Sequence, residues 1–243
     1  MLAPHLRGGL GNQLFQLAAA ETLARESDRT LCMLEHESPK THHTDIEYFT
    51  TIFSEFTKCP LLPAPYATLE ELSFRRGYLN GYEVPNVCFR GYFQNWEYVS
   101  ASFKDRLRLP PTEPTDTVFL HIRGGDFVNN KLHYVDLGEY YQRAIQHFPK
   151  GTRFSVCTND VPFAKSMKFL EDLDHHFVEA DEVTTLSLMA SCSRGGICAN
   201  SSFSWWGAFL NPSRTLVMPD KWFNDPEFYI EGYFFPGVIR IPV

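Results

Sequence analysis

The chain has 243 residues, of which 44% are hydrophobic and 21% are charged, a composition typical of a folded protein with one large or two modest domains. The net charge is −7 and no block of Lys and Arg occurs, which argues against a nucleic-acid-binding protein, because such proteins neutralise phosphates with a basic stripe. No apolar run approaches the roughly 20 residues of a membrane-spanning helix, and the N-terminus does not read as a signal peptide.

The six cysteines include no Cys-x-x-Cys pair. Several of them lie within apolar runs, where a free cysteine behaves as a small hydrophobic residue. The sequence therefore predicts neither a disulfide framework nor a zinc site, and it favours a reducing compartment.

The first half of the chain begins with a strand, a turn and a helix. A short apolar stretch at 2–6 ends at the glycine-rich turn 8–12, and apolar residues at three- and four-residue spacing then predict a helix to about residue 26. Residues 36 to 110 are irregular and rich in aromatic side chains. The other elements expected in this half are strands at 30–34 and 87–93 and a helix at 96–107.

A proline-rich segment at 110–114 predicts a linker, because proline neither continues a helix nor enters a central strand. We expect an N-terminal α/β domain over 1–112 and a C-terminal Rossmann-like domain over 113–243. In the second domain, alternating strands and helices predict a parallel sheet, whose ligands bind beyond the carboxyl ends of the strands. The expected strands are 118–122, 154–157, 177–178, 196–199 and 216–218, and the expected helices are 138–148, 161–173, 182–193 and 203–210.

The segment His-Ile-Arg-Gly-Gly-Asp at 121–126 lies at the carboxyl end of the first of these strands. An arginine in this place, Arg123, can reach a diphosphate while the two glycines let the backbone approach closely. The alternative is a glycine turn whose arginine forms a surface ion pair. Spacing alone does not decide between the two.

Two further segments are typical of helix N-termini, where N–H groups and the helix dipole favour a phosphate. The segment Gly-Gly-Leu-Gly-Asn-Gln-Leu-Phe-Gln at 8–16 matches neither a dinucleotide fingerprint nor a Walker A loop, and a structural turn is its alternative. In the segment Asn-Ser-Ser-Phe-Ser-Trp-Trp-Gly at 200–207, Ser201 is expected either to bind a phosphate or to cap the helix. Its tryptophans, Trp205 and Trp206, are expected in the core.

Two acidic segments each allow a structural and a functional interpretation. In Thr-Asn-Asp at 158–160, Asp160 is expected either to cap the following helix or to accept from a guanine edge. Asp-Leu-Asp-His-His at 172–176 has the residue types of a divalent-metal site. Its position at a helix end in a charged stretch favours a solvated helix end, and we expect no metal.

Taken together, segments 8–16, 121–126 and 201–206 resemble the α1,2-fucosyltransferase family, glycosyltransferase family eleven, in residues, order and approximate separation. The resemblance implies a GT-B-like fold of two facing Rossmann-type α/β domains with a cleft between them, the first on the acceptor side. It implies an inverting transfer of L-fucose from GDP-fucose to a glycan hydroxyl, such as O2 of galactose, without a metal or other cofactor. Without a membrane anchor, we expect a cytoplasmic enzyme of bacterial or viral type.

By position, the resemblance makes Arg123 the diphosphate-binding arginine, and His121 a neighbour that shapes the nucleotide pocket. The chain departs from the family's pattern at Gly124, where the family has a second arginine, and at 158–160, where the family has a Ser-Asp-Asp-like strand end. The other donor-binding residues that it implies are Asp160, Ser201, Ser202, Phe203, Gly9, Asn12 and Gln16.

Transfer also needs a general base to accept the proton of the acceptor hydroxyl. Asp126 is our candidate because it follows the phosphate loop, and bonding to loop N–H groups is its equal alternative. Three other functions stay open: a transferase that uses another GDP-sugar, as Gly124 suggests; a metal-dependent transferase built on Asp172 and Asp174; and a GDP- or glycan-binding module without catalysis.

Overall fold

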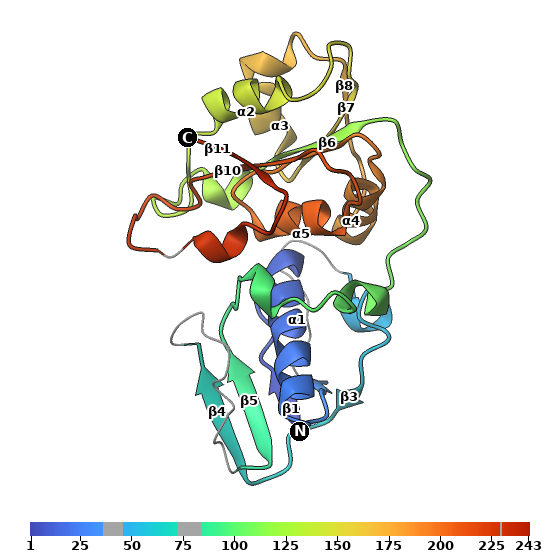
Figure 1. Ribbon diagram of the computed structural model, residues 1–243, viewed down its shortest axis with the longest axis vertical. Coiled ribbons are helices and arrows are strands. Elements are labelled where there is room, and N and C mark those ends of the chain that lie inside the picture. The colour runs from blue at the N-terminus through green and yellow to red at the C-terminus, as the bar shows by residue number, and fades with distance from the viewer. Residues whose placement is uncertain (36–45, 72–83, 229) are drawn as a thin grey trace. The chain divides into compact units, whose positions relative to one another are not determined.

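The computed structural model describes residues 1–35, 46–71, 84–228 and 230–243. The chain divides into two compact units, Met1–Leu109 and Pro110–Val243, so that the second unit begins with the proline-rich segment (Figure 1). Within the described ranges, no helix is long and apolar enough to cross a membrane.

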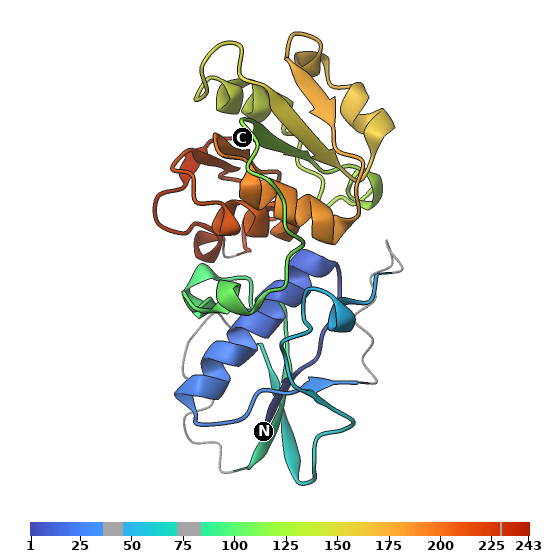
Figure 2. The same ribbon diagram turned by 90° about the vertical axis from the view of Figure 1, so that its right-hand side faces the viewer.

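Unit 1 is built on a three-stranded parallel sheet with the order β1-β5-β4. Helix α1 (Leu10–Glu26) runs along this sheet (Figure 2), and thirteen of its seventeen residues are buried. Apolar and small residues on nearly every side of the helix explain that burial. The strands are β1 (Leu2–Pro4), β4 (Tyr66–Glu70) and β5 (Asn86–Arg90), with β2 (Met33–Leu34) and β3 (Lys58–Cys59) paired separately.

The predicted helix at 96–107 is wrong. Two short 3₁₀ helices, Trp96–Tyr98 and Phe103–Arg106, take its place, because the backbone adopts an extended conformation at Val99. A third 3₁₀ helix, Tyr48–Thr50, lies in the stretch interpreted as irregular. Other parts of that stretch, 36–45 and 72–83, lie outside the described residues.

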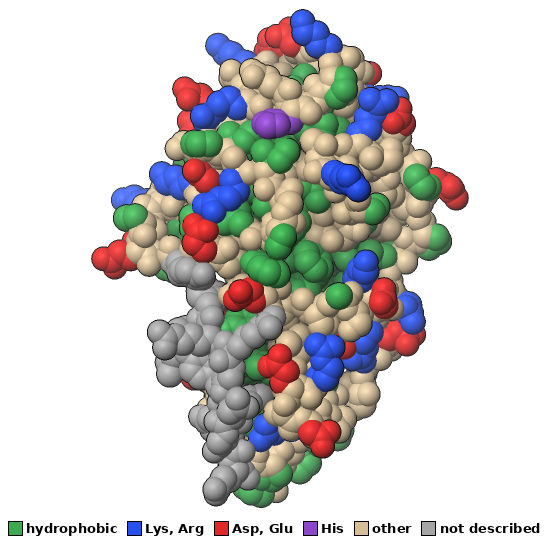
Figure 3. All heavy atoms as spheres, viewed as in Figure 1, with side chains coloured by type: hydrophobic (Ala, Val, Ile, Leu, Met, Phe, Trp, Pro, Cys, Tyr) green, Lys and Arg blue, Asp and Glu red, His purple; other side chains and the backbone are tan. Residues whose placement is uncertain are grey.

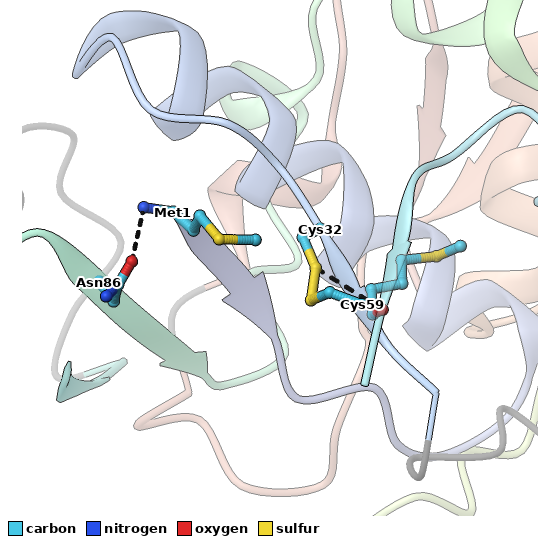
Figure 4. Close-up of a disulfide and its surroundings, with 5 residues drawn as sticks. Met1, Cys32, Cys59 and Asn86 are labelled. Carbon is cyan, nitrogen blue, oxygen red and sulfur yellow. Dashed lines mark hydrogen bonds between the residues drawn. A yellow bond between two sulfur atoms is a disulfide. The ribbon is translucent and has the colours of Figure 1, made fainter. Parts of the chain in front are cut away.

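The expectation that the cysteines form no disulfide is wrong for one pair. Cys32 and Cys59 form a disulfide, with their Cα atoms 6.0 Å apart (Figure 4). The two residues are 27 positions apart, and the parallel pairing of β2 with β3 brings them together, which sequence spacing cannot reveal. The other four cysteines are free and buried, as expected: Cys88, Cys157, Cys192 and Cys198.

Unit 2 is a six-stranded parallel sheet with the order β11-β10-β9-β6-β7-β8. Helices α2 and α3 cover one face, and α4 and α5 cover the other (Figure 1). The strands are β6 (Val118–Ile122), β7 (Phe154–Thr158), β8 (His175–Phe177), β9 (Gly195–Ile197), β10 (Leu216–Pro219) and β11 (Ile239–Ile241). The helices are α2 (Gly138–Ile145), α3 (Val161–Lys165), α4 (Glu182–Ser191) and α5 (Ser202–Leu210).

The order of the strands reverses at β6. From β6 the chain continues outward to β7 and β8, and it then returns to β9, on the other side of β6, before continuing to β10 and β11. In open parallel sheets, ligands bind at such a reversal, beyond the carboxyl ends of the strands. The predicted α/β class is confirmed, and the ends of β6 and β9 mark where a ligand is expected.

The helix predicted at 161–173 is shorter than expected. Helix α3 ends at Lys165, where the Ser166 hydroxyl donates to the Phe163 carbonyl at 2.7 Å, and a 3₁₀ turn, Lys168–Leu170, follows. The chain is extended at Met167 between the two. Strand β11, which sequence reasoning did not predict, completes the far edge of the sheet.

We predict that Gly196→Ala destabilises unit 2 by about 2 kcal/mol, the usual effect of overpacking a core. A Cβ at this buried position in β9 would lie 1.9 Å from the ring of Phe119 on the neighbouring strand. The measurement is the free energy of unfolding in urea. Gly138→Ala is the matched control, because its Cβ would meet nothing closer than Asp136 Oδ1 at 3.4 Å. Equal effects of the two substitutions would contradict the prediction.

Candidate active site

Strand β6 carries the central motif and is buried along its whole length. Leu120 and Ile122 belong to the hydrophobic core that includes Tyr140 and Tyr141 of α2. Because side chains alternate across a strand, His121 points to the opposite face, where its ring lies 5.7 Å from that of Phe203 on α5. Tyr141 donates to the carbonyl of His121 at 2.8 Å.

Arg123 follows the last residue of β6, and its side chain is 17% exposed. Nη2 donates to Asp126 Oδ1 at 2.6 Å, and Cζ lies 4.7 Å from the centre of the Phe127 ring. Burial lowers the pKa of Arg123, and Asp126 opposes that shift. Nε is buried and has no hydrogen-bond partner among the described residues. A buried charged donor without an acceptor is costly, so this atom suits the oxygen of an anionic ligand.

The two glycines after Arg123 are held by the residues that follow β7. The N–H groups of Gly124 and Gly125 donate to Asn159 Oδ1 and Asp160 Oδ2, each at 3.0 Å. The other oxygen of Asp160 accepts from the N–H of Phe163 at 3.0 Å and caps α3. Both carboxylate oxygens of Asp160 therefore bond to the backbone in this structure, which agrees with the capping interpretation.

A side chain at Gly124 has no room. A Cβ there would lie 2.7 Å from Phe163 Cδ1 and 2.8 Å from Asp160 Cβ. Distances below 3.0 Å require the neighbours to shift. The loop is therefore built for glycine at the position where the family's pattern has its second arginine.

His121 is a neutral group in the folded chain. It is 3% exposed, and its Nδ1 has no hydrogen-bond partner in the part of the chain that the structure describes. Burial, and then the charge of Arg123, lowers the pKa of His121 to about 3. Next to a diphosphate, this imidazole can act as a wall or as a neutral hydrogen-bonding group, and it does not act as a cation.

Helix α5 begins at the carboxyl end of β9, next to the end of β6. Ser201 is its N-cap and accepts from the N–H of Phe203 at 3.3 Å, as the capping interpretation expects. Ser202 and Phe203 form the first turn, where the helix dipole favours an anion. Trp205 and Trp206 are fully buried, so the expectation that they are core residues is confirmed.

The glycine-rich segment at 8–16 forms the start of α1 in unit 1. Gly9 is the N-cap of the helix, and the Asn12 side chain accepts from Gln94 Nε2 at 2.6 Å. Gln16, expected to face the donor, is 1% exposed and forms two bonds with the backbone of Arg7, at 2.9 and 3.0 Å. Gln16 therefore holds the turn in this structure.

Unit 2 has a pocket beside Arg123 that sequence reasoning missed. The ring of His133 stacks on the ring of Phe127, with centroids 5.1 Å apart. Phe127 in turn lies against the guanidinium of Arg123. Asn200 donates to the carbonyls of His133 and Trp222 and so ties the loop after β6 to the end of β9. Phe127 directly follows the central motif, but no spacing in the sequence indicates His133. The pocket is lined by Arg123, Phe127, His133, Tyr134, Val135, Asp136, Leu137, Tyr141, Phe163, Met167 and Asn200.

The acidic segment at 172–176 lies at the other end of the sheet. Asp174 precedes β8, so it stands at the amino ends of the parallel strands, whereas Arg123 stands at the carboxyl ends. Nε of Arg153 lies 3.8 Å from Oδ1 of Asp174, within the range of an ion pair. Among the described residues, no group of three or more His, Cys, Asp and Glu side chains has the arrangement of a metal site.

On the face in Figure 3, basic and acidic side chains are interspersed over the described surface. Arg123 is a single, largely enclosed cation, which suits a compact anion such as a diphosphate better than a polyanionic strand.

Comparison with known proteins identifies the family. The model of glycosyl transferase family 11 matches residues 97–237, more than half of the chain, including the central motif and the start of α5. The chain belongs to this family. The predicted resemblance is confirmed, and the protein is an α1,2-fucosyltransferase-like glycosyltransferase.

Relatives of this family-11 chain include an alpha-1,2-colitosyltransferase of Escherichia coli, 28% identical over 93% of this chain and 94% of that protein. The O-antigen biosynthesis glycosyltransferase WbnK of E. coli is 35% identical over 46% of this chain and 40% of that protein. Among solved structures, NodZ alpha-1,6-fucosyltransferase soaked with GDP-fucose is similar at a TM-score of 0.56 and 13% identity, over 87% of this chain and 92% of that one. NodZ from Bradyrhizobium gives a TM-score of 0.53 at 12% identity, over 87% of this chain and 93% of that one. The GT-B-like α/β fold class is thereby confirmed.

We predict that His121 makes the protein less stable in acid. The pKa of His121 is about 3 in the folded chain, against 6.5 ordinarily, so below pH 6.5 the unfolded state binds a proton that the folded state does not. Stability is therefore lost as the pH falls below 6.5. Between pH 7 and pH 5, the parent should lose about 2 kcal/mol more unfolding free energy than His121→Asn. Equal losses, or an imidazole NMR signal of His121 that titrates in this range, would contradict the prediction.

Proposed function

We propose that the protein transfers L-fucose from GDP-fucose to a hydroxyl of a glycan acceptor, O2 of a galactose or a similar sugar, with inversion and without a metal ion. The observation that carries the proposal is Arg123: a half-enclosed cation whose Nε has no hydrogen-bond partner among the described residues, at the end of β6 where the strand order reverses. The start of α5, with the N-cap Ser201 and the first-turn residues Ser202 and Phe203, follows the neighbouring strand β9 and also favours an anion. His121 and Asp160, which lie beside Arg123 in the same unit, are also proposed to line the donor site.

The proposed reaction is a single in-line displacement. The acceptor oxygen bonds to C1 of the sugar while the bond from C1 to the diphosphate oxygen breaks, and negative charge grows on the departing GDP. Groups placed where charge develops lower the barrier most. Arg123 has this role, assisted by the start of α5. We infer that Gly9 and Asn12 also belong to the donor-binding residues, and that Gln16 acts indirectly by holding the turn that carries them.

Asp126 is the proposed base that takes the proton of the acceptor hydroxyl. Its side chain is 52% exposed, so an acceptor can reach it, and its Oδ1 is paired with Arg123. Oδ2 belongs to the same carboxylate and can accept the proton while Oδ1 keeps the arginine in place. The ion pair also gives Asp126 a second role in orienting Arg123.

The donor sugar has a specific rival. The colitosyltransferase relative aligns along nearly the whole chain, which makes colitose the alternative to fucose as the donor sugar. Both sugars would present the same diphosphate to Arg123, so the choice rests on contacts with the sugar ring. Turnover of GDP-fucose and GDP-colitose in one assay separates the two donors. GDP binding without turnover of either would favour a binding module instead.

We predict that Arg123→Ala abolishes acceptor-stimulated release of GDP from GDP-fucose, with a loss of at least about 100-fold, as for other groups that stabilise a developing charge. The measurement uses a panel of galactose-terminated acceptors in the presence of a chelator. Arg153→Ala, at the opposite end of the sheet, is the matched control and should keep the parent's rate. Parent activity that the chelator removes would contradict metal independence, and an active Arg123→Ala variant would contradict the assigned site.

We predict that Asp126→Asn lowers kcat by about 100-fold or more, the usual contribution of a general base. Asparagine keeps an oxygen that can accept from Arg123 and removes the basic group, so the affinity for GDP should change little. The measurements are kcat with saturating acceptor and the dissociation constant of GDP. A kcat within a few-fold of the parent would show that another group takes the proton.

A further inference from the structure

Asn159 has a contact that neither the family resemblance nor the proposed reaction uses. It stands just beyond the carboxyl end of β7, and its residue is exposed. Its Oδ1 accepts from the N–H of Gly124 at 3.0 Å, and its Nδ2 lies 3.4 Å from the carbonyl oxygen of Gly124. One side-chain amide thus bonds to both polar groups of a residue 35 positions away.

The neighbouring side chain extends this contact. Asp160 accepts from the N–H of Gly125, so two consecutive side chains after β7 hold two consecutive N–H groups after β6. The backbone of Gly125 has φ +60, the left-handed region that glycine adopts without strain. A Cβ on Gly125 would also lie 2.6 Å from Asn159 Nδ2.

These contacts change the role of the two glycines. The sequence suggested that they let the backbone approach a phosphate. In the structure they let the loop sit against Asn159, Asp160 and Phe163, and their N–H groups already have acceptors. The side chain of Arg123 is therefore available for an anion, whereas the N–H groups of Gly124 and Gly125 are already used.

The position of Arg123 depends on both of its neighbours. On one side, Ile122 is fixed by its register with Thr158 on β7. On the other side, Gly124 is fixed by Asn159. Between them, the guanidinium is aimed by Asp126 and Phe127.

We propose that Asn159 is a positioning residue for diphosphate binding: its amide fixes Gly124 and thereby sets where the Arg123 guanidinium meets the donor. This inference rests on the proposed function. Because Asn159 acts through the diphosphate-binding arginine, it influences the binding of a nucleoside diphosphate and leaves the binding of the nucleoside part unchanged.

The test compares the affinities of GDP and guanosine for the parent and for Asn159→Ala, by calorimetry at fixed salt. We expect GDP to bind about tenfold more weakly to the variant and guanosine to bind within twofold of the parent. Asn159→Asp keeps the oxygen that accepts from Gly124, but it replaces the Nδ2 donor with an anionic oxygen that faces the Gly124 carbonyl, so it should also weaken GDP binding. Because Asn159 is exposed, the substitutions should leave the melting temperature nearly unchanged.

The matched control is Asn211→Ala. Asn211 also bonds to backbone through both groups of its amide: Nδ2 donates to the carbonyls of Met189 and Cys192, and Oδ1 accepts from the N–H of Ser213. It precedes β10 and so lies at the amino ends of the strands. This variant should lose stability and keep the parent's affinity for GDP.

The outcomes separate this inference from the proposed function. If the parent does not bind GDP, the proposed function fails, and this inference fails with it. If the parent binds GDP and Asn159→Ala binds it equally well, or loses GDP and guanosine affinity alike, only the positioning role is overturned. A GDP affinity of Asn159→Asp equal to that of the parent would also overturn it, because the proposed role needs both groups of the amide.

Discussion

Arg123 has to keep its positive charge at the end of a strand that is buried along its whole length. Burial favours the neutral form, and the carboxylate of Asp126 opposes it. Contact with the ring of Phe127 and the remaining 17% exposure of the side chain also favour the charged form. A guanidinium suits this place because it is weakly hydrated, stays charged and presents several donors in one plane. One of those donors, Nε, has no acceptor among the described residues, and this makes the arginine receptive to an anion.

The two units hold their loops in the same way. In unit 1, Glu71 follows β4 and accepts from the N–H groups of Tyr92 and Phe93, which follow β5. In unit 2, Asn159 and Asp160 follow β7 and accept from Gly124 and Gly125 after β6. In both cases a left-handed residue, Phe93 or Gly125, turns successive N–H groups towards the acceptor. Burial raises the pKa of Glu71, and the two N–H groups oppose that shift.

The chain's departures from the family's pattern meet in one contact. Gly124 replaces an arginine, and Asn159 stands in a segment where the pattern has acidic residues. The structure pairs these two positions directly. A loop without a side chain at Gly124 can lie against the end of β7, and a neutral amide there can bond to both its N–H and its carbonyl. In this chain, the space that a side chain at Gly124 would need is therefore taken by Asp160 and Phe163.

The sequence by itself determined the elements and motifs that depend on near neighbours. The spacing of apolar residues predicted α1 and the alternation of strands and helices in unit 2, and the segment at 121–126 placed Arg123 at the end of a strand. Local periodicity and motif order are enough to predict these features, and with them the α/β class and the family. The 3₁₀ turns at 96–106 were missed because local propensity is weak where side chains pack against distant segments.

Only the tertiary structure decided which distant groups meet. The register of β6 with β7 brings Asn159 and Asp160 to the glycines, and the pairing of β2 with β3 joins Cys32 to Cys59. Burial against α5 keeps His121 neutral, and the turn before α1 takes up the side chain of Gln16. Hydrogen bonding and desolvation act over a few ångströms in space, whatever the separation in sequence. A one-dimensional pattern therefore predicts which residues carry the chemistry, and folding decides which of their atoms remain available for it.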